Sequence, residues 1–326
     1  MPAGKGLSAG LTGFSYFYGI YNKRLEGIVI KSTGSRNIVR TPDGVRTECA
    51  VKGKFRIQGI RTTNPVAIGD RVEFDYEPGH DYGQITRILP RDNYIIRKAT
   101  KLSKDAHIIA ANIDQAWLVV TLADPRTSNG FIDRFLVTAT GYYIPANLIF
   151  NKTDIHNDDL NAACEELITI YEQAGYPCYR VSALRGDGID HLRGLLKDKV
   201  NLFAGHSGVG KSALLKVLDP ALNPKVGEIS NVHRKGMHTT TFAEMFPLSQ
   251  GGYIIDTPGI KEFGLVHFDH VEIPRCFPEM DRLLPECQFS NCTHLHEPGC
   301  AVIRALDTGG VSRMRYNSYL SILNDE

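Results

Sequence analysis

Long apolar runs are absent from this chain of 326 residues, and cysteine is too sparse to supply a disulfide scaffold. No run approaches the roughly 18 to 20 apolar residues that span a bilayer, so we expect no membrane segment. The seven cysteines are few and unevenly spaced, which favours a reducing, cytoplasmic location. The opening segment lacks a compact apolar stretch before a small-residue cleavage site, so we treat residues 1–24 as a leader rather than a secretory signal.

Charge is distributed unevenly, although the net charge is only +1. Residues 1–105 carry 18 Lys and Arg against 10 Asp and Glu, whereas the remainder carries 19 against 26. A basic module joined to an acidic one indicates an anionic partner for the first module, with nucleic acid as the leading class. The alternative is that these charges form only a solvated face.

The first part of the chain predicts a small β-barrel over residues 25–95. Short β-rich runs separated by turn signals lie at residues 27–31, 47–51, 55–57, 71–76 and 84–88. These runs favour an OB-fold, with a barrel of SH3 type as the alternative. Basic residues on or between the early strands accompany Phe55 and combine charge with stacking surface, as RNA-binding surfaces do. These basic residues are Arg36, Arg40, Arg46, Lys52, Lys54, Arg56 and Arg61.

The rest of the chain alternates strand and helix patterns, which predicts a mostly parallel α/β sheet covered on both faces over residues 105–264. A basic segment at residues 91–104 is the expected linker. Strands are predicted at 115–121, 146–150, 177–181, 200–204 and 252–255, and helices at 131–142, 158–174, 189–196 and 211–218. Residues 265–326 remain as a small C-terminal domain.

A glycine-rich loop between a predicted strand and a predicted helix has the pattern of a nucleotide phosphate loop. Its glycines let successive backbone N–H groups point at phosphates, and the helix N-terminus adds its dipole. Lys211 is expected to reach the β and γ phosphates, and Ser212 to bind Mg²⁺. The predicted contacts here are Gly205, His206, Ser207, Gly208, Val209, Gly210, Lys211, Ser212 and Ala213.

Two switch-like segments follow this loop. Asp256 ends a predicted strand and opens the sequence Asp-Thr-Pro-Gly, so we expect it near Mg²⁺, with the Gly259 N–H facing the γ phosphate. One threonine of residues 239–241, taken as Thr240, is the expected third Mg²⁺ ligand, and a plain β-rich run is the alternative reading. With Lys211 and Ser212, these residues form the candidate catalytic set, in which no catalytic base is assigned.

A guanine-reading pattern follows the predicted strand 146–150. The Asp154 carboxylate is able to accept two hydrogen bonds from guanine that adenine cannot donate. The predicted base contacts are Asn151, Lys152, Thr153, Asp154, Ser182 and Ala183, the last two beside a backbone N–H for the guanine oxygen. Ordinary GTPases place this pattern after the phosphate loop, whereas here it starts 54 residues before it. The order predicts a circularly permuted GTPase, with GTP as substrate and GDP as product.

The C-terminal segment contains three cysteines and a histidine with metal-ligand spacing. Cys287, Cys292, His294 and Cys300 lie within 14 residues and predict a closed, structural zinc site. His296 is the alternative to His294, or a residue that supports the ligands. The residues that follow either touch RNA or form a solvated helix: Arg304, Arg313, Arg315, Tyr316 and Tyr319.

From about Gly27 to its end, the chain closely resembles the bacterial small-subunit-dependent GTPase family known as RsgA or YjeQ. The resemblance rests on the barrel, the permuted GTPase motifs and the spacing Cys-x4-Cys-x-His-x5-Cys with His-Glu-Pro-Gly-Cys at residues 296–300. It implies an OB-fold that binds ribosomal RNA, a zinc-bearing domain that touches the small ribosomal subunit, and GTP hydrolysis stimulated by that subunit late in its maturation. We expect a monomer in the cytoplasm.

One position limits the mechanism. Ile260 stands where Ras-like enzymes carry the glutamine that orients the attacking water. Slow intrinsic hydrolysis is therefore expected, with water positioned by His238, by another switch group or by the ribosome. The alternative function is a GTP-gated RNA-binding or translational-control protein in which occupancy, rather than hydrolysis, matters.

Base recognition is testable through Asp154. Asp154→Asn is expected to shift preference from guanine towards xanthine nucleotides, because the new amide donates to the base where the carboxylate accepted. Competition binding with GDP and xanthosine diphosphate measures the shift. An unchanged preference would contradict the permuted assignment.

Overall fold

The structure is a computed structural model that describes residues 24–33, 36–51, 65–76, 81–97, 107–222, 244–256 and 268–325. Several expectations fall outside these ranges. They are nearly all of the leader, the strand at 55–57 with the basic residues around it, the second half of the linker at 91–104, and His238, Thr240, Gly259 and Ile260.

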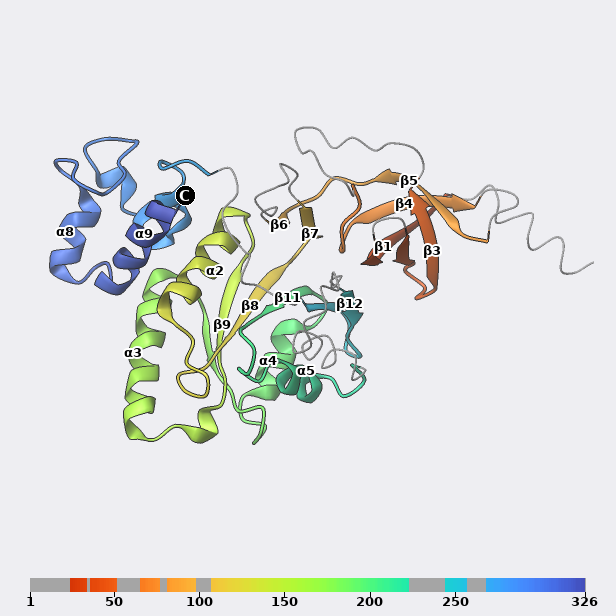
Figure 1. The fold of residues 1–326 in the computed structure, drawn as a ribbon, viewed down its shortest axis with the longest axis horizontal. Helices are drawn as coiled ribbons and strands as arrows, with labels where there is room; N and C mark the ends of the chain where they lie inside the picture. The colour runs from red at the N-terminus through yellow and green to blue at the C-terminus, as the bar shows by residue number, and fades with distance from the viewer. Residues whose placement is uncertain are drawn as a thin grey trace, which may run out of the picture.

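The first domain is a five-stranded closed barrel (Figure 1). Its strands are β1 (Leu25–Ser32), β2 (Asn37–Arg40), β3 (Arg46–Val51), β4 (Arg71–Tyr76) and β5 (Gly83–Ile88). They run in the order β1-β2-β3-β5-β4, with β1 also paired to β4 and β3 parallel to β5. This order confirms the OB-fold over the SH3-type barrel. Val29, Val39, Phe74 and Ile85 are fully buried inside it.

The segment predicted as a linker is partly a strand. β6 (Tyr94–Arg97) pairs antiparallel with β7 (His107–Ala111) and carries the chain towards the second domain. Arg91, at the start of the expected linker, instead binds Asp70, whose side chain is fully buried, at 2.6 and 2.7 Å. The prediction failed because the basic composition of this segment was taken to indicate a solvated linker. An arginine that is paired with a buried carboxylate, as Arg91 is with Asp70, packs within the fold instead.

The central sheet has the phosphate-loop strand at its middle. Its strands are β8 (Gln115–Val120), β9 (Ala146–Phe150), β10 (Cys178–Arg180), β11 (Val200–Ala204), β12 (Glu244–Pro247) and β13 (Tyr253–Asp256). They are ordered β10-β9-β8-β11-β13-β12, and all neighbours are parallel except β12 and β13. β11 therefore lies between a strand that precedes it in the chain and one that follows it, as a permuted GTPase requires.

Helices cover both faces of this sheet, as the buried strands predicted. They are α2 (Asn129–Gly141), α3 (Asp158–Ala174), α4 (Ile189–Leu196) and α5 (Lys211–Leu218), with a 3₁₀ turn η1 (Thr153–Ile155). Leu118 of β8 belongs to the core that packs with α2 and α3, whereas its neighbour Trp117 packs with α4 and α5. Alternate side chains of one strand thus feed two cores.

A buried amide joins the three middle strands. Asn201 of β11 is fully buried, and its Oδ1 accepts hydrogen bonds from Gln115 Nε2 at 2.7 Å and Trp117 Nε1 at 3.2 Å. Its Nδ2 donates to the Tyr253 carbonyl at 3.0 Å and to the Leu196 carbonyl at 2.9 Å. One side chain therefore reaches β8, β13 and the end of α4.

The C-terminal domain is built of short helices and lies beside α2 (Figure 1). Its elements are η4 (Ile273–Cys276), α7 (Pro278–Asp281), η5 (Leu284–Glu286), α8 (Ala301–Thr308) and α9 (Arg313–Asp325). Its core includes Val137, which comes from α2, so the two domains share apolar packing. Among the residues described, no helix is long and apolar enough to cross a membrane.

Arg315 corrects the expectation of an RNA-contacting or solvated C-terminal helix. Its guanidinium is 1% exposed and binds Asp133 of α2 at 2.7 Å and Glu279 of α7 at 2.7 and 3.2 Å. Tyr316 and Tyr319 are buried as well, and only Arg304 and Arg313 face solvent. Helical periodicity does not reveal that a basic side chain has buried acidic partners elsewhere in the chain.

The buried arginine sets a stability prediction. Arg315→Met leaves two buried carboxylates without their cation, so we expect a loss of about 3–5 kcal/mol in the free energy of unfolding. Urea unfolding followed by circular dichroism measures it. Arg313→Met, the same substitution two positions away on an exposed side chain, is the control and is expected to change stability by less than about 0.5 kcal/mol. Equal effects would contradict the structural role.

Candidate nucleotide site and cysteine–histidine cluster

The phosphate loop lies between β11 and α5, where the sequence placed it. Gly205, Gly208 and Gly210 have φ angles of 153°, 90° and 86°. A Cβ at Gly210 would stand 2.5 Å from Asn151 Nδ2, so glycine is required there both by backbone conformation and by a close neighbour. The backbone thus has the bends that phosphate-binding loops need.

Asn151 fastens the base-reading loop to the phosphate loop. Its side chain is almost fully buried, and its Nδ2 donates to the Val209 carbonyl at 2.9 Å. Its Oδ1 accepts from the Ala183 N–H at 3.2 Å. Three segments far apart in the chain meet through one amide, so the predicted contacts around residues 151, 183 and 209 lie together.

The remaining base-reading residues surround Asp154. Its carboxylate accepts a hydrogen bond from the Ser182 hydroxyl at 2.6 Å, and this bond holds the pKa of Asp154 below its ordinary value. Thr153 Oγ1 donates to the Val181 carbonyl at 3.0 Å, and the Lys152 ammonium donates to the Asp124 carbonyl. Asp154 is therefore ionised near neutral pH and remains an acceptor, as guanine recognition requires. The Ala183 N–H already binds Asn151, which sequence alone did not indicate.

Lys211 and Asp256 meet at the opposite side of the phosphate loop. The Lys211 ammonium forms an ion pair with the Asp256 carboxylate, and their side chains are 12% and 4% exposed. β11 and β13 bring them together because the two parallel strands end at the same edge of the sheet. Ser212 is the second residue of α5, directly after Lys211, so hydroxyl and carboxylate oxygens are available to a hard cation such as Mg²⁺.

His206 turns towards helix α2. Its ring stacks on Phe131 with centroids 3.7 Å apart and planes inclined by 31°. Both residues line a cleft of about 630 Å³ that Arg134, Met314 and Asn317 also border. Phe131 was not among the residues predicted from sequence, because an aromatic residue near the start of a helix resembles ordinary core.

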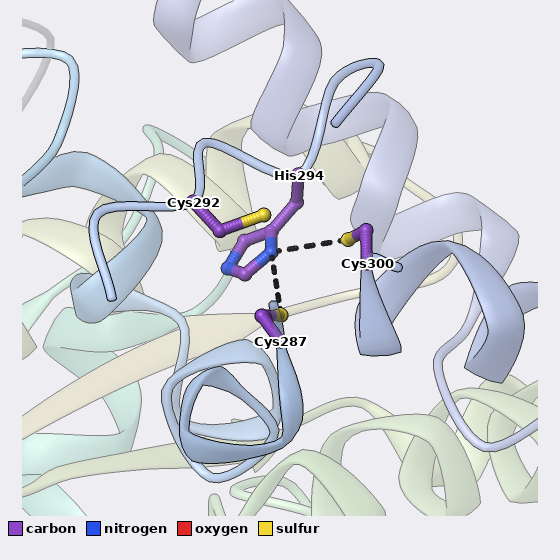
Figure 2. Close-up of side chains that lie close together, drawn as sticks. All are labelled: Cys287, Cys292, His294 and Cys300. Carbon is purple, nitrogen blue, oxygen red and sulfur yellow. Dashed lines mark hydrogen bonds between the residues drawn. The ribbon is translucent and has the colours of Figure 1, made fainter. Parts of the chain in front are cut away.

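The cysteines and the histidine of the C-terminal domain converge (Figure 2). The ligand atoms of Cys287, Cys292, His294 and Cys300 all lie within 4.8 Å of one another. His294 Nδ1 stands 3.4 Å from Cys300 Sγ and 3.7 Å from Cys287 Sγ. The structure places His294 in the cluster, whereas His296 is exposed. Three thiols and an imidazole at this spacing are able to hold a metal ion.

Glu297 organises the loop that carries this cluster. Burial acts to raise its pKa, but hydrogen bonds outweigh that effect and hold the pKa at about 2. The donors are the Thr293 N–H at 2.6 Å, the Thr293 hydroxyl at 2.5 Å, the Leu295 N–H at 2.9 Å and the His296 N–H at 3.1 Å. Tyr316 adds a hydroxyl bond to the His294 carbonyl at 2.7 Å. Sequence analysis assigned no role to Glu297, although its place among the ligands was a usable indication.

Comparisons with known proteins agree on one family. The family described as RsgA GTPase matches residues 88–266, and the RsgA N-terminal domain matches residues 26–83. A relative named small ribosomal subunit biogenesis GTPase RsgA from Bacteroides fragilis is 52% identical over 303 residues, covering 93% of this chain and 97% of that protein. A protein of the same name from Porphyromonas gingivalis is 51% identical over 308 residues, with the same coverage.

Solved structures give the same match. The structure of YjeQ from Thermotoga maritima superposes with a TM-score of 0.75 at 33% identity, covering 93% of this chain and 98% of that one. The structure of YloQ, described as a circularly permuted GTPase, has a TM-score of 0.71 at 26% identity, covering 94% and 96%.

Proposed function

The chain belongs to the RsgA GTPase family, and on that premise we propose that it acts in late maturation of the small ribosomal subunit. It hydrolyses GTP to GDP and phosphate, and the proposal adds that contact with the subunit and its RNA accelerates the reaction. The observation that carries the proposal is the Asn151 amide, which joins the base-reading loop to the phosphate loop in permuted order. We further propose that the protein works as a monomer in the cytoplasm.

The proposed roles of the site residues follow from their chemistry. Asp154 accepts from the guanine base, and the backbone of the phosphate loop from Gly205 to Ser212 binds the phosphates. Lys211 neutralises charge that develops on the phosphates in the transition state, which is why its loss should abolish turnover. Ser212 and Asp256 offer the oxygen donors for Mg²⁺, which supplies further charge neutralisation when bound. Thr240 and Gly259 stay predictions for the third ligand and the γ-phosphate contact.

The flanking domains are the proposed ribosome contacts. We place the OB-fold at residues 25–95, the GTPase domain at 105–264 and the C-terminal domain at 265–326. OB-folds bind single-stranded or looped RNA through strand faces and adjoining loops. In this barrel the Arg36 guanidinium lies 4.5 Å from the centre of the Tyr82 ring, which presents charge and aromatic surface together.

Hydrolysis with purified small subunits tests this function. We expect subunits to raise the GTP turnover of the wild-type chain by about tenfold or more, which corresponds to lowering the activation barrier by at least about 1.4 kcal/mol. Large subunits serve as the control and should leave the rate unchanged. The Lys211→Ala variant is expected to bind small subunits but not to hydrolyse GTP. A wild-type rate that is equal with and without small subunits would favour the GTP-gated RNA-binding alternative.

We also propose that the cysteine–histidine cluster holds one structural zinc ion. Four soft or borderline ligands in a buried, closed group fit tetrahedral zinc and leave no position for a catalytic water. The ion would fasten the loop from Cys287 to Cys300 to the start of α8, where the Ala301 N–H donates to Cys287 Sγ at 3.3 Å. Zinc thereby supports the helices that pack on α2.

Metal analysis of purified protein tests the zinc assignment. Wild type is expected to carry about one zinc ion per chain, and Cys300→Ser to lose it and unfold at a lower temperature, because structural zinc contributes directly to folding. Cys276→Ser is the matched control, since Cys276 is a buried cysteine of the same domain outside the cluster. It should retain its zinc. Full zinc content in Cys300→Ser would exclude the proposed ligand set.

A further inference from the structure

Helix α2 touches the phosphate loop and the C-terminal domain within five residues. Phe131 stacks on His206 of the phosphate loop at 3.7 Å between ring centres. Asp133 binds the buried guanidinium of Arg315 in α9 at 2.7 Å. Asn129, four positions before Asp133, donates from Nδ2 to Met314 Sδ at 2.8 Å. Residues four apart share one face of a helix, so Asn129 and Asp133 meet α9 together.

Two side chains from outside the phosphate loop contact it, Asn151 and Phe131. Asn151 holds the Val209 carbonyl from the base-reading loop, and Phe131 holds the His206 ring from α2. Position matters here because a phosphate loop stabilises the transition state only when its N–H groups are aimed before the reaction begins. A small displacement of α2 therefore alters the geometry of hydrolysis without removing any group that touches the nucleotide.

Arg315 makes the position of α2 depend on the C-terminal domain. Its guanidinium is shared between Asp133 of α2 and Glu279 of α7, and it lies 4.8 Å from the centre of the Phe277 ring. Both carboxylates are buried, so α2 cannot slide away from α9 without leaving a buried charge unpaired. Buried charge pairing therefore ties the position of α2 to that of the C-terminal domain.

We propose that α2 is the positioning element through which the C-terminal domain sets the phosphate loop, with Phe131 and Asp133 as its two positioning residues. The inference rests on the proposed function for its trigger: subunit contact with the C-terminal domain changes GTP turnover through this helix. Both residues lie in α2, outside the phosphate loop and the base-reading loop, so the expected effect is a change in turnover rather than in nucleotide recognition.

Two alanine variants around the same guanidinium separate this link from general stability. Asp133→Ala removes the bond to α2 and leaves the Arg315–Glu279 pair intact. Glu279→Ala is the matched control, because it removes the bond inside the C-terminal domain and leaves Arg315–Asp133 intact. Phe131→Ala removes the stacking contact, and Phe131→Tyr preserves it.

The first measurement is hydrogen exchange of the full-length protein with GDP bound and without ribosomal subunits. The amides of residues 205–212 should exchange faster in Phe131→Ala and Asp133→Ala, and as in wild type in Phe131→Tyr and Glu279→Ala. Unchanged exchange in both link variants, or an equal rise in Glu279→Ala, would overturn the proposal. This readout needs no ribosome, so it decides the link even if subunits fail to stimulate the wild-type chain and the proposed function falls.

Subunit-stimulated hydrolysis is the second measurement. We expect Asp133→Ala and Phe131→Ala to lower stimulated kcat by about five- to tenfold, with KM for GTP changed by less than about twofold. Because both act in one chain of contacts, the double variant should be no slower than the slower single variant. Fully additive losses, or losses confined to KM, would refute a shared positioning role.

Discussion

The side-chain amide of Asn201 holds together the strands around which the nucleotide site is arranged. Asn201 lies in β11, between β8 and β13. Its amide is hydrogen-bonded to Gln115 and Trp117 of β8 and to the Tyr253 carbonyl of β13. The permutation leaves β8 and β13 without the direct chain connection that an ordinary GTPase gives them. Sheet pairing and this amide must therefore keep both strands in register with β11, because a slip would move every following loop.

Correct register places all the site loops at one edge. β8, β9, β11 and β13 are parallel neighbours, so their carboxyl ends meet where nucleotides bind in such sheets. Asn151 leaves β9 and Asp256 ends β13, on the two sides of the phosphate loop that follows β11. Chain order can thus change while the site stays intact, because spatial order is set by strand pairing. The permutation changes only which flanking domain is connected by the chain to each side of the nucleotide site.

The sequence was most informative where local pattern and chemistry coincide. The range of helix α5 follows from the glycine-rich loop before it, and that of α3 from its amphipathic pattern; the structure adds Asn157 as the N-cap of α3. β2 was missed because four residues with two apolar side chains give too short an alternation. The burial of Arg315 could not be foreseen, since its acidic partners stand 36 and 182 positions away in the chain. The same limit hid Phe131, whose partner His206 belongs to another motif.

The two flanking domains are attached to the GTPase domain by contacts of different kinds. The barrel continues the central sheet, because β1 pairs antiparallel with β12 where Lys31 and Glu244 form an ion pair at 3.1 Å. The ion pair itself contributes only about 0–1 kcal/mol. Arg40 adds a hydrogen bond to the Tyr253 hydroxyl at 2.8 Å, and Ile30 is buried in the same core as Ile255. Arg315 and Asp133 are almost completely buried, and separating them would leave charge without partner or water. The barrel is therefore joined to the GTPase domain at a sheet edge, while the C-terminal domain is joined through buried charge on α2 and is suited to pass a displacement to that helix.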